Sequence, residues 1–320
     1  MTIKMETPVL YFYAGTPLHA RADVRFHGGA ISQWYPPRSR GEVPPAPTAG
    51  ENGQLVGGDL DFGGGHEGSI GWDFDILGPG DGPATDVFRG DETLTWVLPR
   101  LTDGNRVRTA DGATEKYLFY RGIGNFALPL RTVVKGGRLR VSNTGADAIP
   151  FALVFRCDGD GNAAFKTIDG IPPGIDVDAS GTSIDGLDPG AMWRPNLYAA
   201  LHTALTGQGL YPKEADAMIQ TWWHSYFNAA GLRVFWIVPR AFLDRTLPLD
   251  VSPRPRQIER VLVGRSEVLT TEFEAALLAD FNDEGATVES IKAGVPPAWT
   301  RWATDRFGGA YEARVAALSR

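Results

Sequence analysis

The sequence predicts a β-rich α+β protein, with an N-terminal antiparallel β-sandwich or jelly-roll-like body and a helix-containing C-terminal region packed on it. Three observations lead to this class. Short apolar segments alternate with turn residues through the first half of the chain. Glycine and proline, which interrupt regular elements, number 39 and 23 among 320 residues. Beyond residue 190 the apolar residues recur at helical steps. We therefore divide the chain into regions 1–190 and 191–320, packed as one unit.

The first half is predicted to be mostly strands. In Arg21–His27 the apolar residues Ala22, Val24 and Phe26 alternate with polar ones, so they share one face of a strand. A Gly-Gly pair follows and signals a hairpin into Ile31–Tyr35. The other strands expected here are Val9–Tyr13, Thr93–Leu98, Lys116–Tyr120, Phe126–Val134, Arg138–Ser142 and Phe151–Arg156, the last two paired with each other. Long loops are expected at Pro36–Gly58 and Asp158–Gly190.

The second half mixes helices with strands. In Pro212–Ala229, the residues Ala215, Met218, Trp222 and Tyr226 recur at three- and four-residue steps and so share one face. Pro212 suits the first turn of a helix. The other elements expected are helices at Leu197–Thr206, Thr271–Phe281 and the tail from Trp299, and strands at Leu232–Val238 and Glu259–Val268.

The aromatic segment TWWHSYF belongs to this second helix. We expect Trp222 to face the core, because it shares a face with Met218 and Tyr226, and His224 to lie on the solvated face. The alternative is an aromatic shelf that faces a carbohydrate.

Charge and composition exclude several classes of protein. The net charge of −7 argues against a nucleic-acid partner and against docking on anionic lipid. No run of apolar residues is long enough for a membrane helix. The one cysteine, Cys157, has no partner for an internal disulfide or a thiolate metal site, so we expect it to be a small buried residue.

Three motifs are weighed and set aside. The five histidines form no zinc-binding spacing such as HExxH. GGGHEG, at Gly63–Gly68, fits the dinucleotide-binding pattern, but the residues after it do not read as the helix that the pattern requires. HGGA, at His27–Ala30, is similar to an esterase oxyanion segment, but no GxSxG nucleophile motif occurs in the chain.

A calcium loop is the one cofactor site considered, and no other cofactor is expected. Asp158, Asp160, Asn162 and Asp169 occupy positions one, three, five and twelve of a segment, as oxygen ligands do in calcium loops. Ala163 takes the place of the usual glycine at position six. A solvated turn is the favoured reading, with calcium as the alternative.

Carboxylates are the remaining candidates for chemistry. Glycosidases use two carboxyl groups across a cleft, one as acid and the other as base or nucleophile. Six lie within or beside ordered segments: Glu6, Glu67, Asp73, Glu214, Glu259 and Glu267. Of these we choose Glu6, Glu67 and Glu267 as catalytic candidates. For substrate binding we choose Trp34, Trp72, Tyr120 and Arg121, because aromatic rings stack on sugars and the last two would stabilise developing negative charge.

Four segments carry a resemblance to known sequences. They are KMETPVLYFY, KYLFYRGIGNF, GLYPKEADAMIQTW and RVLVGRSEVLT. Together they resemble a group of uncharacterised bacterial proteins that open with the same Lys-Met-Glu-Thr-Pro block. The resemblance spans most of the chain and implies one unit covering both halves, and it carries no catalytic residue over. Its members often carry an export leader, so a periplasmic or secreted location is expected if a leader was removed and a cytoplasmic one otherwise.

Two functions follow as hypotheses. The first is a hydrolase acting on a glycan or related polymer with paired carboxylates. The second is a non-catalytic protein that binds carbohydrate or protein. The expected partner is a glycan or small molecule, and the oligomeric state is open.

Overall fold

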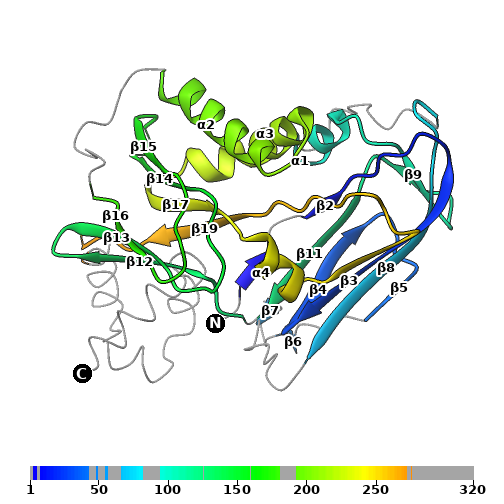
Figure 1. The fold of residues 1–320 in the computed structure, drawn as a ribbon, viewed down its shortest axis with the longest axis horizontal. Helices are drawn as coiled ribbons and strands as arrows, with labels where there is room; N and C mark the ends of the chain where they lie inside the picture. Colours follow the sequence, from blue (N-terminus) through cyan, green and yellow to red (C-terminus); the bar gives the residue numbers. More distant parts are fainter. Residues whose placement is uncertain are drawn as a thin grey trace.

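A computed structural model of the chain describes residues 3–5, 8–42, 48–49, 55–56, 66–81, 94–124, 126–158, 160–180, 192–271 and 275. The β-rich α+β class is confirmed: strands predominate, every strand pairing described is antiparallel, and the longer helices lie in the second half. Figure 1 shows a sheet-rich part that carries the N-terminal strands and a second part covered by helices. No helix within the described ranges is long and apolar enough to span a bilayer.

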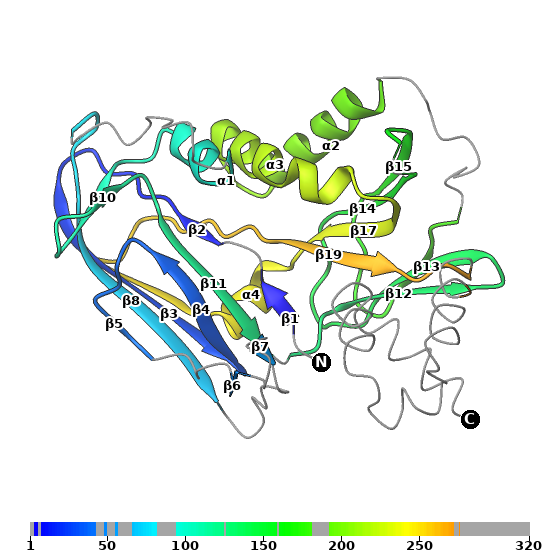
Figure 2. The ribbon, with the colours of Figure 1, turned by 180° about the vertical axis from the view of Figure 1, so that it is seen from behind.

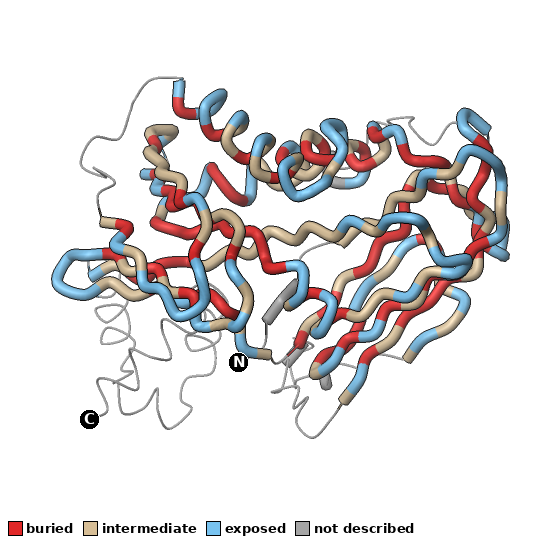
Figure 3. The backbone as a smooth tube through the Cα atoms, in the orientation of Figure 1, coloured by how far each residue is buried: buried red, intermediate tan, exposed pale blue. Residues whose placement is uncertain are grey.

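Two antiparallel sheets form the first part and pack over a shared core. Ala22, Val24 and Phe26 point into this core, which confirms the alternation predicted for their strand, and Trp72 is fully buried beside them. Figure 3 shows the same alternation of buried and exposed residues along these strands.

One sheet has the order β10-β9-β8-β3-β18, with β5 beside β8, and contains β3 (Leu18–His27), β5 (Arg40–Gly41), β8 (Glu67–Ile76), β9 (Val107–Thr109), β10 (Thr114–Glu115) and β18 (Leu249–Ser252). The other has the order β1-β11-β2, with β4 beside β11, and contains β1 (Ile3–Met5), β2 (Val9–Leu10), β4 (Gly29–Tyr35) and β11 (Leu118–Gly124).

The second part has three layers. A central sheet, in the order β15-β14-β17-β19, is covered on one face by helices and on the other by a small sheet, β12-β13-β16 (Figures 1 and 2). Because β14 and β17 are covered on both faces, their sequences are mostly apolar, and each contains a single arginine, Arg156 in β14 and Arg233 in β17. The elements are β12 (Leu130–Lys135), β13 (Arg138–Asn143), β14 (Ala152–Cys157), β15 (Ala163–Ile168), β16 (Asp176–Asp178), α2 (Trp193–Gly207), α3 (Pro212–Phe227), β17 (Gly231–Ile237), α4 (Arg240–Thr246) and β19 (Val263–Val268).

The helix predicted around TWWHSYF is confirmed as α3. Pro212 is its first residue, and Ala215 and Tyr226 are buried against the central sheet. Trp222 is partly buried in the same cluster and stacks on Tyr226 at 5.7 Å between ring centroids, whereas His224 is exposed. The predictions that Trp222 packs with Met218 and Tyr226 and that His224 is solvated are confirmed, and Trp222 keeps a partly exposed side that lines the cavity described below.

Several local predictions are wrong, each because a longer-range contact decides. Thr93–Leu98, predicted as a strand, contains α1 (Leu94–Val97) and the start of the 3-10 helix η1 (Leu98–Leu101), which packs against α3. The strands β3 and β4 do not form a paired hairpin, since β3 pairs with β8 and β4 with β11. The turn between them carries the chain from one sheet to the other.

The pairing predicted between Arg138–Ser142 and Phe151–Arg156 is also wrong. β13 pairs with β12 through a turn at Gly136 and Gly137, both with positive φ, and with β16 on its other side. Such a two-glycine turn closes a tight hairpin. The segment predicted as a loop after Asp158 contains β15, which pairs with β14, and β16.

Some predictions concern residues that are only partly described. The predicted loop at Pro36–Gly58 contains β5 and a small pairing of β6 (Thr48–Ala49) with β7 (Leu55–Val56). The helix expected at Thr271–Phe281 lies almost wholly outside the described residues, and the tail from Trp299 lies entirely outside them. The division at residue 190 stays a prediction.

Candidate functional site

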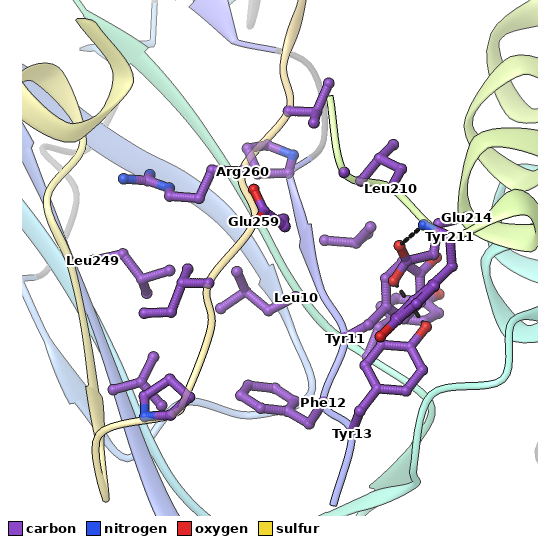
Figure 4. A pocket seen from close by; sticks show the side chains of 18 of the residues that line it. Leu10, Tyr11, Phe12, Tyr13, Leu210, Tyr211, Glu214, Leu249, Glu259 and Arg260 are labelled. Carbon is purple, nitrogen blue, oxygen red and sulfur yellow. Dashed lines mark hydrogen bonds between the residues drawn. The ribbon is translucent and has the colours of Figure 1, made fainter. Parts of the chain in front are cut away.

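A cavity of about 860 Å³ lies where the two parts of the molecule meet. Three pieces of chain supply most of its wall: residues 8–15, residues 209–226, which include most of α3, and residues 249–263. Figure 4 shows two of these as extended segments on either side of the opening, with α3 beyond one of them. The lining is mainly aromatic and aliphatic, with a few polar groups placed at its ends.

The segment after β2 supplies alternating side chains to the cavity. Its backbone is held by Asn105, whose N–H donates to the Phe12 carbonyl at 2.7 Å and whose side chain exchanges two hydrogen bonds of 3.0 Å with Ala14. Because the segment is extended, Leu10 and Phe12 point to one side, and Tyr11 and Tyr13 point to the other, toward α3 (Figure 4).

Glu214 is the more buried of the two carboxylates in the described wall, the other being Glu259. Its side chain belongs to the first turn of α3, where Oε2 accepts the Tyr211 backbone N–H at 2.8 Å as part of a capping box. Oε1 accepts the Tyr13 hydroxyl at 2.8 Å. The residue is only 8% exposed, behind the Tyr13 and Tyr211 rings, whose centroids are 4.8 Å apart.

Electrostatics at this end favour neutral tyrosines. Burial raises the pKa of Tyr11, and the charge of Glu214 raises it further. The pKa of Tyr13 is also raised, by burial and then by its hydrogen bond to Glu214. Both phenols therefore stay protonated near neutral pH, and Tyr13 donates its hydrogen bond to the Glu214 carboxylate.

The opposite wall is the extended segment that leads into β19. Glu259 lines it and accepts Gln257 Nε2 at 2.8 Å, with Arg240 Nη1 at 3.8 Å. Arg260 points away from water, donating to the Asp244 carboxylate at 2.8 Å and to the Leu247 carbonyl at 2.7 Å. Two further arginines in this wall, Arg254 and Arg256, are exposed.

The structure describes two of the three predicted catalytic residues and places them on different sheets. Glu6 lies outside the described residues. Glu67 is on the outer side of β8, where it pairs with His27 at 2.7 Å and both side chains are well exposed. Glu267 is buried on β19 with Arg233, which reaches both of its oxygens at 3.1 Å, and with Arg265. A carboxylate held by two arginines serves the fold, so the geometry gives the catalytic prediction no support.

Of the predicted substrate-binding residues, Tyr120 alone is among the cavity-lining side chains described. Burial raises its pKa, and Arg260 lies against its hydroxyl. Trp72 is a core residue that donates its ring N–H to the Pro36 carbonyl at 3.0 Å. Trp34 lies under the Arg38 guanidinium, 4.0 Å from its ring centroid, and Arg121 donates to Gln33 Oε1 at 3.2 Å.

The predicted calcium ligands fall at opposite ends of a strand. Asp158 accepts the backbone N–H groups of Asp160 and Asn162 at 2.8 and 3.1 Å, and the Asn162 side chain at 2.6 Å, so it closes a tight turn. Asp169 follows β15, whose six residues hold it about 20 Å from that turn. In the described portion, no group of three or more His, Cys, Asp or Glu side chains is arranged to hold a metal.

Glu214 and Glu259 are among the six carboxylates that the sequence singles out, but neither is among the three predicted catalytic residues. Glu214 follows Pro212 and reads as a helix-capping residue, which it also is. Tyr11 and Tyr13 lie in a run of five apolar or aromatic residues in which every position looks equally buried. A period of two in that run was the available signal, because it separates the two tyrosines from Leu10 and Phe12.

The fold and the cavity together define a β-rich α+β protein with a ligand-sized internal cleft between two packed parts. When the chain is compared with protein-family models, with curated proteins and with solved structures, none of them matches it.

Proposed function

We propose that this protein binds a small organic ligand with a large apolar part in the cavity between residues 8–15, α3 and residues 249–263. The observation that carries the proposal is a cavity of about 860 Å³ lined mainly by aromatic and aliphatic side chains. Ligand pockets typically measure roughly 300–1,000 Å³ and combine such a lining with a few oriented polar groups. Glu214, Tyr11 and Tyr13 supply polar groups of this kind.

Filling the cavity tests this proposal. Met218 lines the cavity, whereas Gln220, on the same helix, is exposed. Fluorescence titration with the uncharged dye N-phenyl-1-naphthylamine is expected to give saturable binding. Met218→Trp should weaken that binding by about tenfold or more, since the added ring occupies ligand volume. The control Gln220→Trp should leave it unchanged.

The result that contradicts the proposal is equally plain. Either a dye titration without saturation, or one with equal affinity in Met218→Trp and wild type at matched melting temperatures, removes the cavity as a binding site.

A second candidate function is hydrolysis, in keeping with the glycan hydrolase expected from the sequence. It is favoured by one observation: Glu214 and Glu259 line the same cavity from opposite walls (Figure 4). Acid–base or nucleophilic hydrolysis of a glycoside needs two carboxyl groups on either side of the scissile bond. Glu214→Gln and Glu259→Gln should each abolish turnover of chromogenic glycosides and esters if this function holds. Turnover that survives both substitutions excludes it.

A further inference from the structure

The two ends of the cavity wall differ in charge. At one end is Glu214, a buried carboxylate whose two oxygens each accept one hydrogen bond within the described structure. An ionised carboxylate has about four acceptor positions, so about two remain for a ligand. A cation there would gain from the low local dielectric and from the faces of the neighbouring Tyr13 and Tyr211 rings.

At the other wall, Arg254 and Arg256 are exposed cations. Among the residues that the structure describes, neither side chain has a hydrogen bond or an ion pair. Pro253 and Pro255 each have a fixed φ, and Pro255 also biases Arg254, which precedes it, to an extended conformation. Guanidinium groups bind carboxylates in a planar, two-bond geometry.

Between these ends the cavity offers an apolar wall with an unpaired hydroxyl among its described residues. Residues 253–262 belong to no described strand, and the carbonyls of Ile258 and Leu262 accept hydrogen bonds from Arg240 and from the Val238 N–H. Met218 and Trp222 line the apolar part. Thr221 lines it too, and its buried hydroxyl has no hydrogen-bond partner in the described structure.

The spacing of Glu214 and Thr221 along α3 sets the length of ligand chain that would reach from one to the other. Glu214 and Thr221 lie seven residues apart on the helix, almost on one line, which places them about 10 Å apart along its axis. An extended chain rises about 3.3 Å per residue, so three residues cover that distance. The cavity volume of about 860 Å³ leaves room for their side chains.

We infer that the ligand is a short peptide of about three to five residues with apolar side chains, bound as a zwitterion, with its amino group at Glu214 and its carboxylate at Arg254 and Arg256. This inference rests on the proposed binding function and names its ligand class. A cationic ligand without an anionic end would leave the two arginines unpaired, and an anionic one would meet Glu214. A peptide with free ends satisfies both walls.

Matched peptides test the inference against the same dye. The tripeptide Leu-Phe-Leu and the pentapeptide Leu-Phe-Leu-Phe-Leu, each with free ends, N-acetylated or C-amidated, are titrated as competitors of N-phenyl-1-naphthylamine. Acetylation is expected to weaken binding by about tenfold or more, because it removes the charge that faces Glu214. Amidation should weaken it by about three- to tenfold, since the arginines are exposed.

Variants assign each effect to its residue. In Glu214→Gln, which keeps the side-chain shape, the penalty of acetylation should vanish while the penalty of amidation remains. In the double variant Arg254→Gln and Arg256→Gln the reverse is expected. Arg138→Gln, an exposed arginine of β13 outside the cavity lining, is the control and should change neither ratio.

The outcomes separate the two proposals. If the dye binds but free, acetylated and amidated peptides compete equally, the peptide inference is overturned and the cavity remains a binding site. An acetylation penalty that persists in Glu214→Gln also overturns it. If neither dye nor peptide binds, the proposed function itself fails.

Discussion

The two ends of α3 each hold a buried charge, and the fold treats them differently. At the C-terminal end, Arg233 is fully buried and donates to both oxygens of Glu267 and to three carbonyls at the end of the helix, those of Tyr226, Ala229 and Ala230. At the N-terminal end, Glu214 has two partners and lies in a cavity wall. Both charges suit the helix dipole, which favours cations at its C-terminus and anions at its N-terminus.

The difference teaches where function can reside. The Arg233 site has all its hydrogen bonds inside the protein, so it holds α3 against β17 and β19 and offers nothing to a ligand. The Glu214 site keeps acceptor capacity and faces open volume. Burial and charge alone therefore do not mark a functional carboxylate, because Glu267 and Glu214 are equally buried, at 8% exposure each.

The largest effect on stability is expected at Arg233, at the C-terminal end of α3. Arg233→Ala should lower the free energy of unfolding by about 3–5 kcal/mol, because it leaves Glu267 and three carbonyls at and just after the end of α3 without their buried partner. Urea unfolding measures this loss. As a control, Arg233→Met combined with Glu267→Leu should cost less than Arg233→Ala, since it leaves no buried carboxylate without its arginine, although the three carbonyls lose their donor and Arg265 loses its carboxylate in this variant. Equal losses in the two variants would show that the ion pair is not the cause.

At Glu214, at the N-terminal end of α3, the expected effect on stability is smaller. Glu214→Ala should cost about 1–3 kcal/mol, because the Tyr13 hydroxyl and the Tyr211 N–H lose their acceptor. Glu214→Gln should cost less than Glu214→Ala, since the amide oxygen still accepts one of those hydrogen bonds. Urea unfolding of the two variants gives the comparison, and a larger cost for Gln than for Ala would contradict it.

Gly209 sharpens the comparison because it lies where the segment before α3 approaches Glu259 of the opposite wall. Its φ of +103° is unfavourable for other residues, and an added Cβ would lie 2.8 Å from Glu259 Cγ. Gly209→Ala is therefore expected to cost about 1–2 kcal/mol in thermal or urea unfolding and to displace Glu259. The matched control is Gly207→Ala, where nothing lies within 4 Å of the added Cβ. A loss in Gly207→Ala as large as in Gly209→Ala would show that these contacts are not responsible.

Alkaline pH probes the tyrosines beside Glu214. Because the pKa of Tyr11 is raised in the folded protein, its contribution to stability is complete below its ordinary value of about 10 and declines as pH rises above that value. Urea unfolding between pH 9 and 11 should show this decline in wild type and a shallower one in Tyr11→Phe. Identical slopes in the two proteins would mean that Tyr11 titrates alike in both states.

The smallest effect is expected at Glu67. Its pair with His27 is exposed, so Glu67→Gln should change the free energy of unfolding by less than about 1 kcal/mol and leave dye affinity unchanged. Loss of dye binding in Glu67→Gln would show that Glu67 contributes to the ligand site.

The features predictable from sequence were those set by near neighbours. The alternation in β3, the face of α3 that carries Met218 and Trp222, and the exposed position of His224 follow from periods of two and 3.6 residues. Strand partners did not follow, because pairing β14 with β17 depends on residues far apart in the chain.

The candidate site could not be predicted from the sequence for the same reason. Tyr13 and Glu214 are 201 positions apart, and their hydrogen bond leaves no mark in either local segment. Glu267 looked as promising as Glu214, because the sequence does not show that Arg233 and Arg265 surround it.

Hydrogen–deuterium exchange with the tightest-binding peptide tests the ligand site most directly. If the ligand occupies the cavity, exchange should slow in residues 8–15, 209–222 and 253–263, which line it, and stay unchanged in β12 and β13, which do not. Slower exchange confined to β12 and β13, or no change in any of the three lining segments at saturating peptide, would contradict a ligand site in the cavity beside Glu214.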